Sequence, residues 1–120
     1  MRRQEILDHA RKKYGVDPDY PWRRSPNYAI LRHGHSRKWF AAIVDVTEDK
    51  LGLDGDRLVD VLNIKCDPLL IGPLRELPWA FPAWHMNKEH WLSILLGGAA
   101  LKAPKAEVFG LLDMSYELTR

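Results

Sequence analysis

The start of the chain carries apolar side chains at the spacing of an amphipathic helix. Their positions follow an i, i+1, i+4, i+8 pattern, which places them on one stripe of a helix over residues 3–14. The stripe consists of Ile6, Leu7, Ala10 and Tyr14. Arg11, Lys12 and Lys13 suit the negative end of the helix dipole, and Gly15 is a typical C-terminal stop. We therefore predict that the chain opens with a helix packed on the rest of the fold.

From there to residue 65 the apolar residues form short runs separated by turn-forming residues, a pattern typical of strands. The predicted strands are residues 20–24, 28–32, 38–46 and 58–65. Alternation divides the last strand between two faces of a sheet: Leu58, Asp60, Leu62 and Ile64 on one, and Val59, Val61, Asn63 and Lys65 on the other. These strands predict an antiparallel meander.

The sequence Asp67-Pro68 predicts the start of a second helix, since aspartate suits the N-cap and proline the first helical position. Gly72-Pro73 interrupts that helix, and a proline in a helix interior costs about 3 kcal/mol or more. We expect either a break at Gly72 followed by a short turn, or a strongly kinked helix. In both cases Pro78 ends it.

The last third of the chain predicts two strands and a final helix. Residues 81–85 and 90–96 are the strands, and residues 84–91 contain the tight turn between them. Residues 97–103 are predicted to form a loop, after which Pro104 opens the helix. The buried stripe of that helix is predicted to comprise Val108, Leu111, Leu112, Ser115 and Leu118.

The predicted element order is α-β-β-β-β-α-β-β-α, counting the short first strand. Runs of strands interrupted by single helices indicate an α+β fold: a mostly antiparallel twisted sheet with helices packed on it. A length of 120 residues suits a single domain, residues 1–120.

The distribution of charge along the chain is more informative than the net charge of +2. Residues 1–40 carry ten Lys or Arg against four Asp or Glu, a net of +6, whereas residues 41–120 carry eight against twelve, a net of −4. A basic face made from the first forty residues would attract phosphate or another polyanion. A solvated helix followed by a basic hairpin explains the same counts, so both interpretations stay open.

The cysteine and histidine residues offer little support for catalysis or metal binding. A single cysteine, Cys66, excludes an internal disulfide and fits a reducing compartment, and no apolar run approaches the roughly 18 residues of a membrane span. We expect a cytoplasmic protein without a membrane partner, in which Cys66 is a buried core thiol. Four of the five histidines lie in two turns, His33 and His35 in one and His85 and His90 in the other, and their spacing is not specific for a metal. With no recognisable catalytic motif, we expect neither an enzyme nor a bound metal or cofactor.

Five tryptophans in 120 residues raise the possibility of a ligand surface. Trp22 and Trp39 lie among the cations of the first forty residues, and nucleic-acid surfaces combine cations for phosphates with aromatic faces for bases. A tryptophan-rich core is the other interpretation, and we prefer it for Trp91 and Trp84.

Five ordered motifs connect the chain with a known family. They are Tyr14-Gly15, Lys38-Trp39-Phe40-Ala41, Leu62-Asn63-Ile64-Lys65-Cys66-Asp67-Pro68, His85-Met86-Asn87-Lys88-Glu89-His90-Trp91 and Ser115-Tyr116-Glu117-Leu118. In these motifs the chain resembles the MmcQ/YjbR family of small bacterial proteins. The resemblance implies a compact domain similar to secretion-chaperone-like and frataxin-like folds, and a DNA-binding label that rests on a double-wing arrangement of hairpins. It implies no catalytic residues. The chain departs from the family pattern at Gly72-Pro73 and in its two-histidine turn.

Our first hypothesis is a DNA-binding protein with two hairpin wings, at residues 33–38 and 87–88, and a basic N-terminal third. The residues predicted to contact DNA are Arg23, Arg24, Arg32, Arg37, Lys38, Trp39, Lys65, Asn87, Lys88 and His90. Asn87 has the donor–acceptor pair that suits an adenine edge, and Arg37 or Arg32 suits guanine.

Two other hypotheses remain. The aromatic sheet face with Trp22 and Trp39 could belong to a protein-interaction or chaperone-like module that binds a peptide or a second copy of the chain. A weaker one is a small-molecule or metal site around His85, Lys88 and His90.

Overall fold

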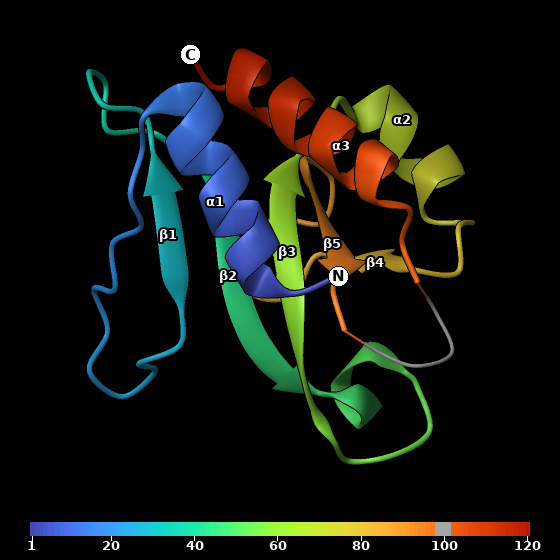
Figure 1. Ribbon diagram of the computed structural model, residues 1–120. Helices are drawn as coiled ribbons and strands as arrows, with labels where there is room; N and C mark the ends of the chain where they lie inside the picture. Colours follow the sequence, from blue (N-terminus) through green and yellow to red (C-terminus); the bar gives the residue numbers. More distant parts are fainter. Residues whose placement is uncertain (98–101) are drawn as a thin grey trace.

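A five-stranded antiparallel sheet lies at the centre of the protein, and helices cover one of its faces (Figure 1). The computed structural model describes residues 1–97 and 102–120. The strands are β1 (Ala29–Arg32), β2 (Trp39–Thr47), β3 (Leu58–Lys65), β4 (Ala80–Pro82) and β5 (Trp91–Leu95), in the spatial order β1-β2-β3-β5-β4. The helices are α1 (Arg3–Tyr14), α2 (Pro68–Leu74) and α3 (Lys105–Leu118), with a short 3₁₀ helix, η1, at Glu48–Leu51.

The predicted α+β fold with an antiparallel sheet is confirmed, but one predicted strand is wrong. Residues 20–24 form no strand; the chain touches β1 through a single bridge, in which Asp19 and Ile30 exchange both backbone hydrogen bonds at 2.9 and 2.8 Å. Prolines on both sides of the bridge residue Asp19, at positions 18 and 21, have no N–H to donate, so the pairing cannot extend. The predicted loop at residues 97–103 falls largely outside the described residues.

The sheet buries apolar side chains on both faces. On the helix-covered face, α1, α2 and α3 pack over a large cluster in which Phe40, Leu62 and Leu92 are fully buried. On the other face a smaller cluster forms along β2, β3 and β5, comprising Val44, Val46, Val59, Val61 and Leu95. Tyr28, Phe81 and Trp84 pack against its margins. The alternation predicted for β3 is confirmed, with Leu62 and Ile64 under the helices and Val59 and Val61 on the opposite face.

Tryptophan positions in the core differ from the prediction. Trp91 does not anchor the core, because it pairs with Lys65 on the helix-free face and is only half-buried. Trp79, just before β4, is the buried tryptophan of the main cluster. Trp84 is half-buried and packs against the smaller cluster.

Helix α2 begins as predicted but neither breaks at Gly72 nor continues to Pro78. The Asp67 carboxylate accepts a hydrogen bond from Leu69 N at 2.9 Å, and Pro68 occupies the first turn. Pro73 lies one residue before the end of the helix, so its missing N–H removes a bond only in the last turn. The chain then continues through turns, with Leu77 N donating to Leu74 O at 3.1 Å.

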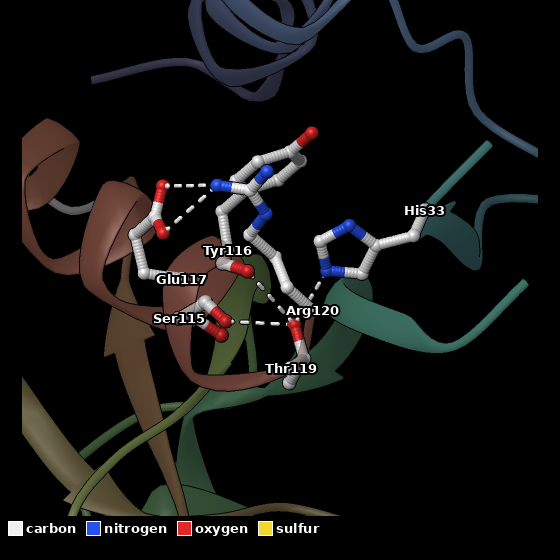
Figure 2. A network of polar contacts seen from close by, with 6 residues as sticks. All are labelled: His33, Ser115, Tyr116, Glu117, Thr119 and Arg120. Atoms are coloured by element: carbon white, nitrogen blue, oxygen red, sulfur yellow. Dashed lines mark hydrogen bonds and ion pairs between the residues drawn. The ribbon is translucent and has the colours of Figure 1, made fainter. Parts of the chain in front are cut away.

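The C-terminal end of α3 is fixed by a buried polar network (Figure 2). Thr119 Oγ1 donates to Ser115 O at 2.8 Å, so the ring of His33 is the donor in the 2.7 Å contact between its Nε2 and Thr119 Oγ1. Thr119 is buried, whereas Leu118, predicted for the buried stripe, is 48% exposed and Leu111 is half-buried. His33 is also buried, against the rings of Phe40 and Tyr116, although it lies at the start of a turn. Burial, and then the charge of Arg120, lower the pKa of His33.

Ser115 of α3 joins β2 and β3 where their pairing stops. The last paired residues are Ala41 and Ile64; one step further, Lys65 N donates to Ser115 Oγ at 2.8 Å and Ser115 Oγ donates to Phe40 O at 2.5 Å. The hydroxyl therefore stands between two backbone groups that would otherwise face each other. On the other side of β2, the pairing with β1 skips Phe40, which is a β-bulge. The bulge sends Phe40 under the helices and Trp39 to the opposite face.

Replacing Ser115 by alanine should destabilise the protein strongly for so small a change. Ser115 is fully buried, so Ser115→Ala leaves the Phe40 carbonyl and the Lys65 N–H without their partner, at an expected cost of about 1–3 kcal/mol per group. Urea unfolding at pH 7 measures the difference. Ser36→Ala, in an exposed turn, is the control and should change stability by less than about 0.5 kcal/mol. Equal stability of the two variants would contradict this role.

Helices α1 and α3 are joined by the carboxylate of Asp113. It accepts hydrogen bonds from Lys13 Nζ at 2.6 Å and from the Tyr14 hydroxyl, and His9 Nε2 lies 3.0 Å from it. Partial burial opposes the charged form of Asp113, but these hydrogen bonds outweigh it and lower its pKa. Burial, and then the bond to Asp113, raise the pKa of Tyr14 well above its usual value.

The lowered pKa of Asp113 makes a pH-dependent contribution to stability. The carboxylate stabilises the fold above its unfolded pKa, about 3.9, and this contribution disappears as the pH falls through the lower folded value. Asp113→Asn should therefore lose about 1 kcal/mol at pH 7, discounted for partial solvent exposure, and progressively less as the pH falls below the unfolded pKa. Urea unfolding of both proteins across this range measures the difference. A deficit that does not change with pH would contradict the assignment.

Candidate nucleic-acid interface

Both hairpin turns lie at the same end of the sheet. The turn at residues 33–38 joins the end of β1 to the start of β2. The start of β2 pairs with β3 near its end, and the end of β3 pairs with the start of β5. The turn at residues 83–90, between β4 and β5, therefore lies at this end too. In Figure 1 the arrowheads of β1 and β3 point the same way, toward this end of the sheet. The two predicted wings are thus neighbours.

On the helix-free face, this end of the sheet carries two lysines and two tryptophans. Trp39 starts β2, while Lys65 ends β3 directly opposite Trp91 of β5. Together with Lys38 these side chains line a cavity of about 360 Å³, which α3 closes at its C-terminal end through Leu118 and Thr119. Two of the predicted lysines, Lys38 and Lys65, therefore come together around tryptophan rings.

A second cavity, of about 440 Å³, adjoins the first through Trp39, which lines both. The ring of Trp22 meets Trp39 edge-on at 5.8 Å between centroids and 74° between planes, and meets Tyr28 at 6.1 Å and 84°. Arg24 lies in the lining. We call this the aromatic cup; its lining comprises Trp22, Arg24, Ser25, Tyr28, Ile30, Trp39, Ala42, Val44, Asn63, His85 and Met86. The segment that fails to form a strand, residues 20–24, thus supplies part of its wall.

A buried polar network supports the cup from below. Asn63 is 1% exposed; its Nδ2 donates to Trp84 O at 2.9 Å and its Oδ1 accepts from the Ser93 hydroxyl. Trp84 N donates in turn to Ser93 Oγ at 2.8 Å. These bonds hold the chain just before His85, which has a φ of 64° in the left-handed region. The strand residues thereby set the position of a turn residue in the cup.

Two of the predicted arginines are occupied by an internal partner. Arg32 Nε lies 2.9 Å and Arg37 Nη2 3.1 Å from the same carboxylate oxygen of Asp19. The Arg32 guanidinium also lies over the Trp39 ring, 5.4 Å from its centroid. Arg32 is therefore placed to support Trp39, and neither arginine is as free to meet a base as the sequence suggested.

The remaining predicted residues lie outside both cavities. Asn87 Oδ1 accepts from Glu89 N at 2.8 Å and so shapes the turn, while Lys88 and His90 are exposed in the same turn. Arg23 is exposed in the turn before β1. The structure thus gathers Arg24, Lys38, Trp39 and Lys65, and leaves Arg23, Asn87, Lys88 and His90 around them.

Sequence reasoning missed Tyr28 and Asn63, and it considered His85 only for a small-molecule or metal site with Lys88 and His90. Tyr28 and His85 enter the cup through loop conformations that the pattern does not specify. Asn63 gave a signal, because it is a polar residue in the otherwise apolar run Val61 to Ile64. Such a residue, if buried, needs partners, and here it has Ser93 and Trp84.

The histidines do not converge on a metal site in the described part of the chain, where no three His, Cys, Asp or Glu side chains cluster as ligands. Cys66 is buried as predicted, and burial raises the pKa of its thiol, with Asp67 adding to the effect.

A further depression, of about 620 Å³, lies at the opposite end of the sheet. It is lined by Arg3 and Asp60, which pair with each other at 2.7 Å, and by no aromatic side chain. Its main charges are satisfied internally, so it is a weaker candidate than the two adjoining cavities.

The sequence model of the YjbR family matches residues 11–118. The chain belongs to the YjbR family. Among its relatives, the uncharacterised protein YyaQ of Bacillus subtilis (strain 168) is 43% identical over 120 residues, covering 100% of this chain and 99% of YyaQ.

Solved structures agree with the fold of this YjbR-family chain. A crystal structure of a Pseudomonas syringae protein, 44% identical, superposes with a TM-score of 0.94 over the whole of both chains, and a solution structure from the same organism with 0.86, covering all of this chain and 94% of the other. Deinococcus radiodurans DR2400 is 21% identical with a TM-score of 0.71, over 97% of this chain and 76% of that one, and supports the fold alone. In the residues described here, no helix is long and apolar enough to cross a membrane.

The network under the cup should behave as one unit. Asn63→Leu and Ser93→Ala should each cost about 1–3 kcal/mol, because each leaves a buried partner unpaired. The double variant should be less destabilised than the sum of the two, with a coupling of at least about 0.5 kcal/mol. Urea unfolding of the wild type, the two single variants and the double variant completes this double-mutant cycle. Losses of stability that simply add would show that the two side chains act independently.

Proposed function

We propose that this YjbR-family protein is a cytoplasmic DNA-binding protein that contacts DNA through the end of the sheet shared by its two hairpin turns. The observation that carries the proposal is the meeting of Lys38 and Lys65 with Trp39 and Trp91 in one cavity, beside the turn that presents Lys88. Cations for phosphates and aromatic faces for bases or sugars are what a nucleic-acid surface requires.

Several of the predicted cations are available for a polyanion. Among the described residues, five of the predicted cations form no ion pair: Arg23, Arg24, Lys38, Lys65 and Lys88. Arg32 and Arg37 share a single Asp19, so that group retains a net positive charge. Arg32, Arg37 and Lys38 of the basic N-terminal third thereby contribute charge to the same end as Lys65 and Lys88.

The spacing of the two turns suits a single DNA segment. The β1–β2 and β4–β5 hairpins are separated by three strand spacings in the order β1-β2-β3-β5-β4, or about 14 Å. Both turns can therefore contact one stretch of DNA at once, as a double-wing arrangement requires.

We propose a binding role without catalysis. The raised pKa of Cys66 opposes the thiolate form that a nucleophile needs. His33, the buried histidine beside this end of the sheet, is engaged with Thr119.

Removing two lysines from the proposed surface should weaken DNA binding and its salt dependence together. Lys65→Gln/Lys88→Gln removes two phosphate contacts, so the slope of log K against log salt should fall by about 2 and low-salt affinity by about tenfold or more. Fluorescence anisotropy with a labelled 20-base-pair duplex at 50 and 200 mM salt measures both.

The matched control is Lys50→Gln/Lys102→Gln, which changes the net charge equally at exposed positions away from this end. It should reduce affinity only slightly. Equal losses in the two double variants would refute the proposed surface, and so would a wild type that binds neither duplex nor single-stranded DNA at 50 mM salt.

A further inference from the structure

We propose that the aromatic cup holds one unstacked base of single-stranded DNA, with the next nucleotide lying over Trp91 in the adjoining cavity. This inference rests on the proposed function and specifies which form of DNA reaches the site. It depends on the aromatic lining of the cup, the amide at its base and the cations beside it.

The rings of the cup are arranged to accept another ring. Trp22, Tyr28, Trp39 and His85 meet one another at interplanar angles of 49° to 84°, and no two of them stack in parallel. A planar ligand can therefore stack on one ring while meeting others edge-on, which aromatic groups favour. A volume of about 440 Å³ lies in the lower part of the range for small-molecule pockets and accommodates a nucleobase.

The polar groups of the cup favour a base over a cation or a purely apolar ligand. Arg32 already lies over Trp39, and Arg24 is part of the lining, so a cationic ligand would meet like charge. Asn63 uses one amide N–H and one lone pair for Trp84 and Ser93. Considering only the described residues, its second N–H and second lone pair have no bonding partner, and Asn63 lies in the lining at the base of the cup.

The two cavities give the strand a path. Trp39 lines both, Arg24 lies on the cup, and Lys38 and Lys65 lie in the neighbouring cavity with Trp91. A base in the cup therefore places its phosphates beside cations, and the following base meets a second tryptophan. Duplex DNA cannot fill the cup in this way, since its bases are paired and stacked.

The test measures the affinity of the wild type, Trp22→Ala and Tyr20→Ala for single-stranded dT12 and for a 12-base-pair duplex. Trp22 is 41% exposed and Tyr20 51%, so both variants should fold, which circular dichroism checks. Loss of one stacked base should weaken dT12 binding by about tenfold or more in Trp22→Ala. Tyr20, two residues away and outside the cup, should have no effect, and duplex binding should change less than twofold in both variants.

A dT12 chain that lacks its bases keeps its phosphates, so it separates the contribution of base stacking to the affinity from that of charge. The abasic chain should bind the wild type more weakly than dT12 binds Trp22→Ala, because it also lacks the base over Trp91, and Trp22→Ala should not weaken it further. Competition with thymidine monophosphate tests whether the site prefers a strand or a free nucleotide. Because the monophosphate lacks the neighbouring phosphates, it should displace dT12 only at far higher concentration. Displacement by it at equal concentration would overturn the strand assignment.

The outcomes distinguish this inference from the proposed function. Suppose that neither Trp22→Ala nor removal of the bases from dT12 changes the affinity, but that Lys65→Gln/Lys88→Gln lowers it. The cup is then not a base site, and the proposed DNA-binding surface stands. If neither dT12 nor duplex binds the wild type at low salt, the proposed function fails and this inference fails with it.

Discussion

The hydroxyl of Ser115 is the contact on which this end of the protein depends. It takes the place of a backbone hydrogen bond between β2 and β3, accepting from Lys65 N and donating to Phe40 O. A helix side chain thereby fixes the point at which two strands separate. Because the bulge at Phe40 lies at the same place, the chain can direct Phe40 into the core and Trp39 to the opposite face. The positions of Trp39, which lines both cavities, and of Lys65, which lines one of them, follow from this one junction.

Local patterns predicted the elements well because their causes are local. The first helix, with its apolar stripe and Gly15 stop, and the strand from Leu58 to Lys65 have the predicted bounds. The Asp67-Pro68 start of α2 was likewise correct, since an N-cap needs only its own neighbours. In each case the residues that specify the element are the residues within it.

Predictions that depended on distant partners were less successful. The burial of His33 requires Thr119, 86 positions later, and the exchange of Trp91 for Trp79 in the core depends on strand pairing and the bulge. The sequence likewise placed Arg32 and Arg37 on the surface without indicating that Asp19 would pair with both. For the site, cations and tryptophans of the first forty residues could be predicted as a group, but not the cup that Tyr28, Asn63 and His85 complete.

The bridge between Asp19 and Ile30 also determines how this sheet meets other chains. An open strand edge is a template for pairing with another strand. Here β1 is short and its outer backbone groups at Ile30 are already bonded to Asp19, while the opposite edge strand, β4, has three residues and ends in Pro82, which has no N–H. Strand addition at either edge is therefore disfavoured. The fold can expose an aromatic, helix-free face to a ligand while its protected edges limit edge-to-edge aggregation.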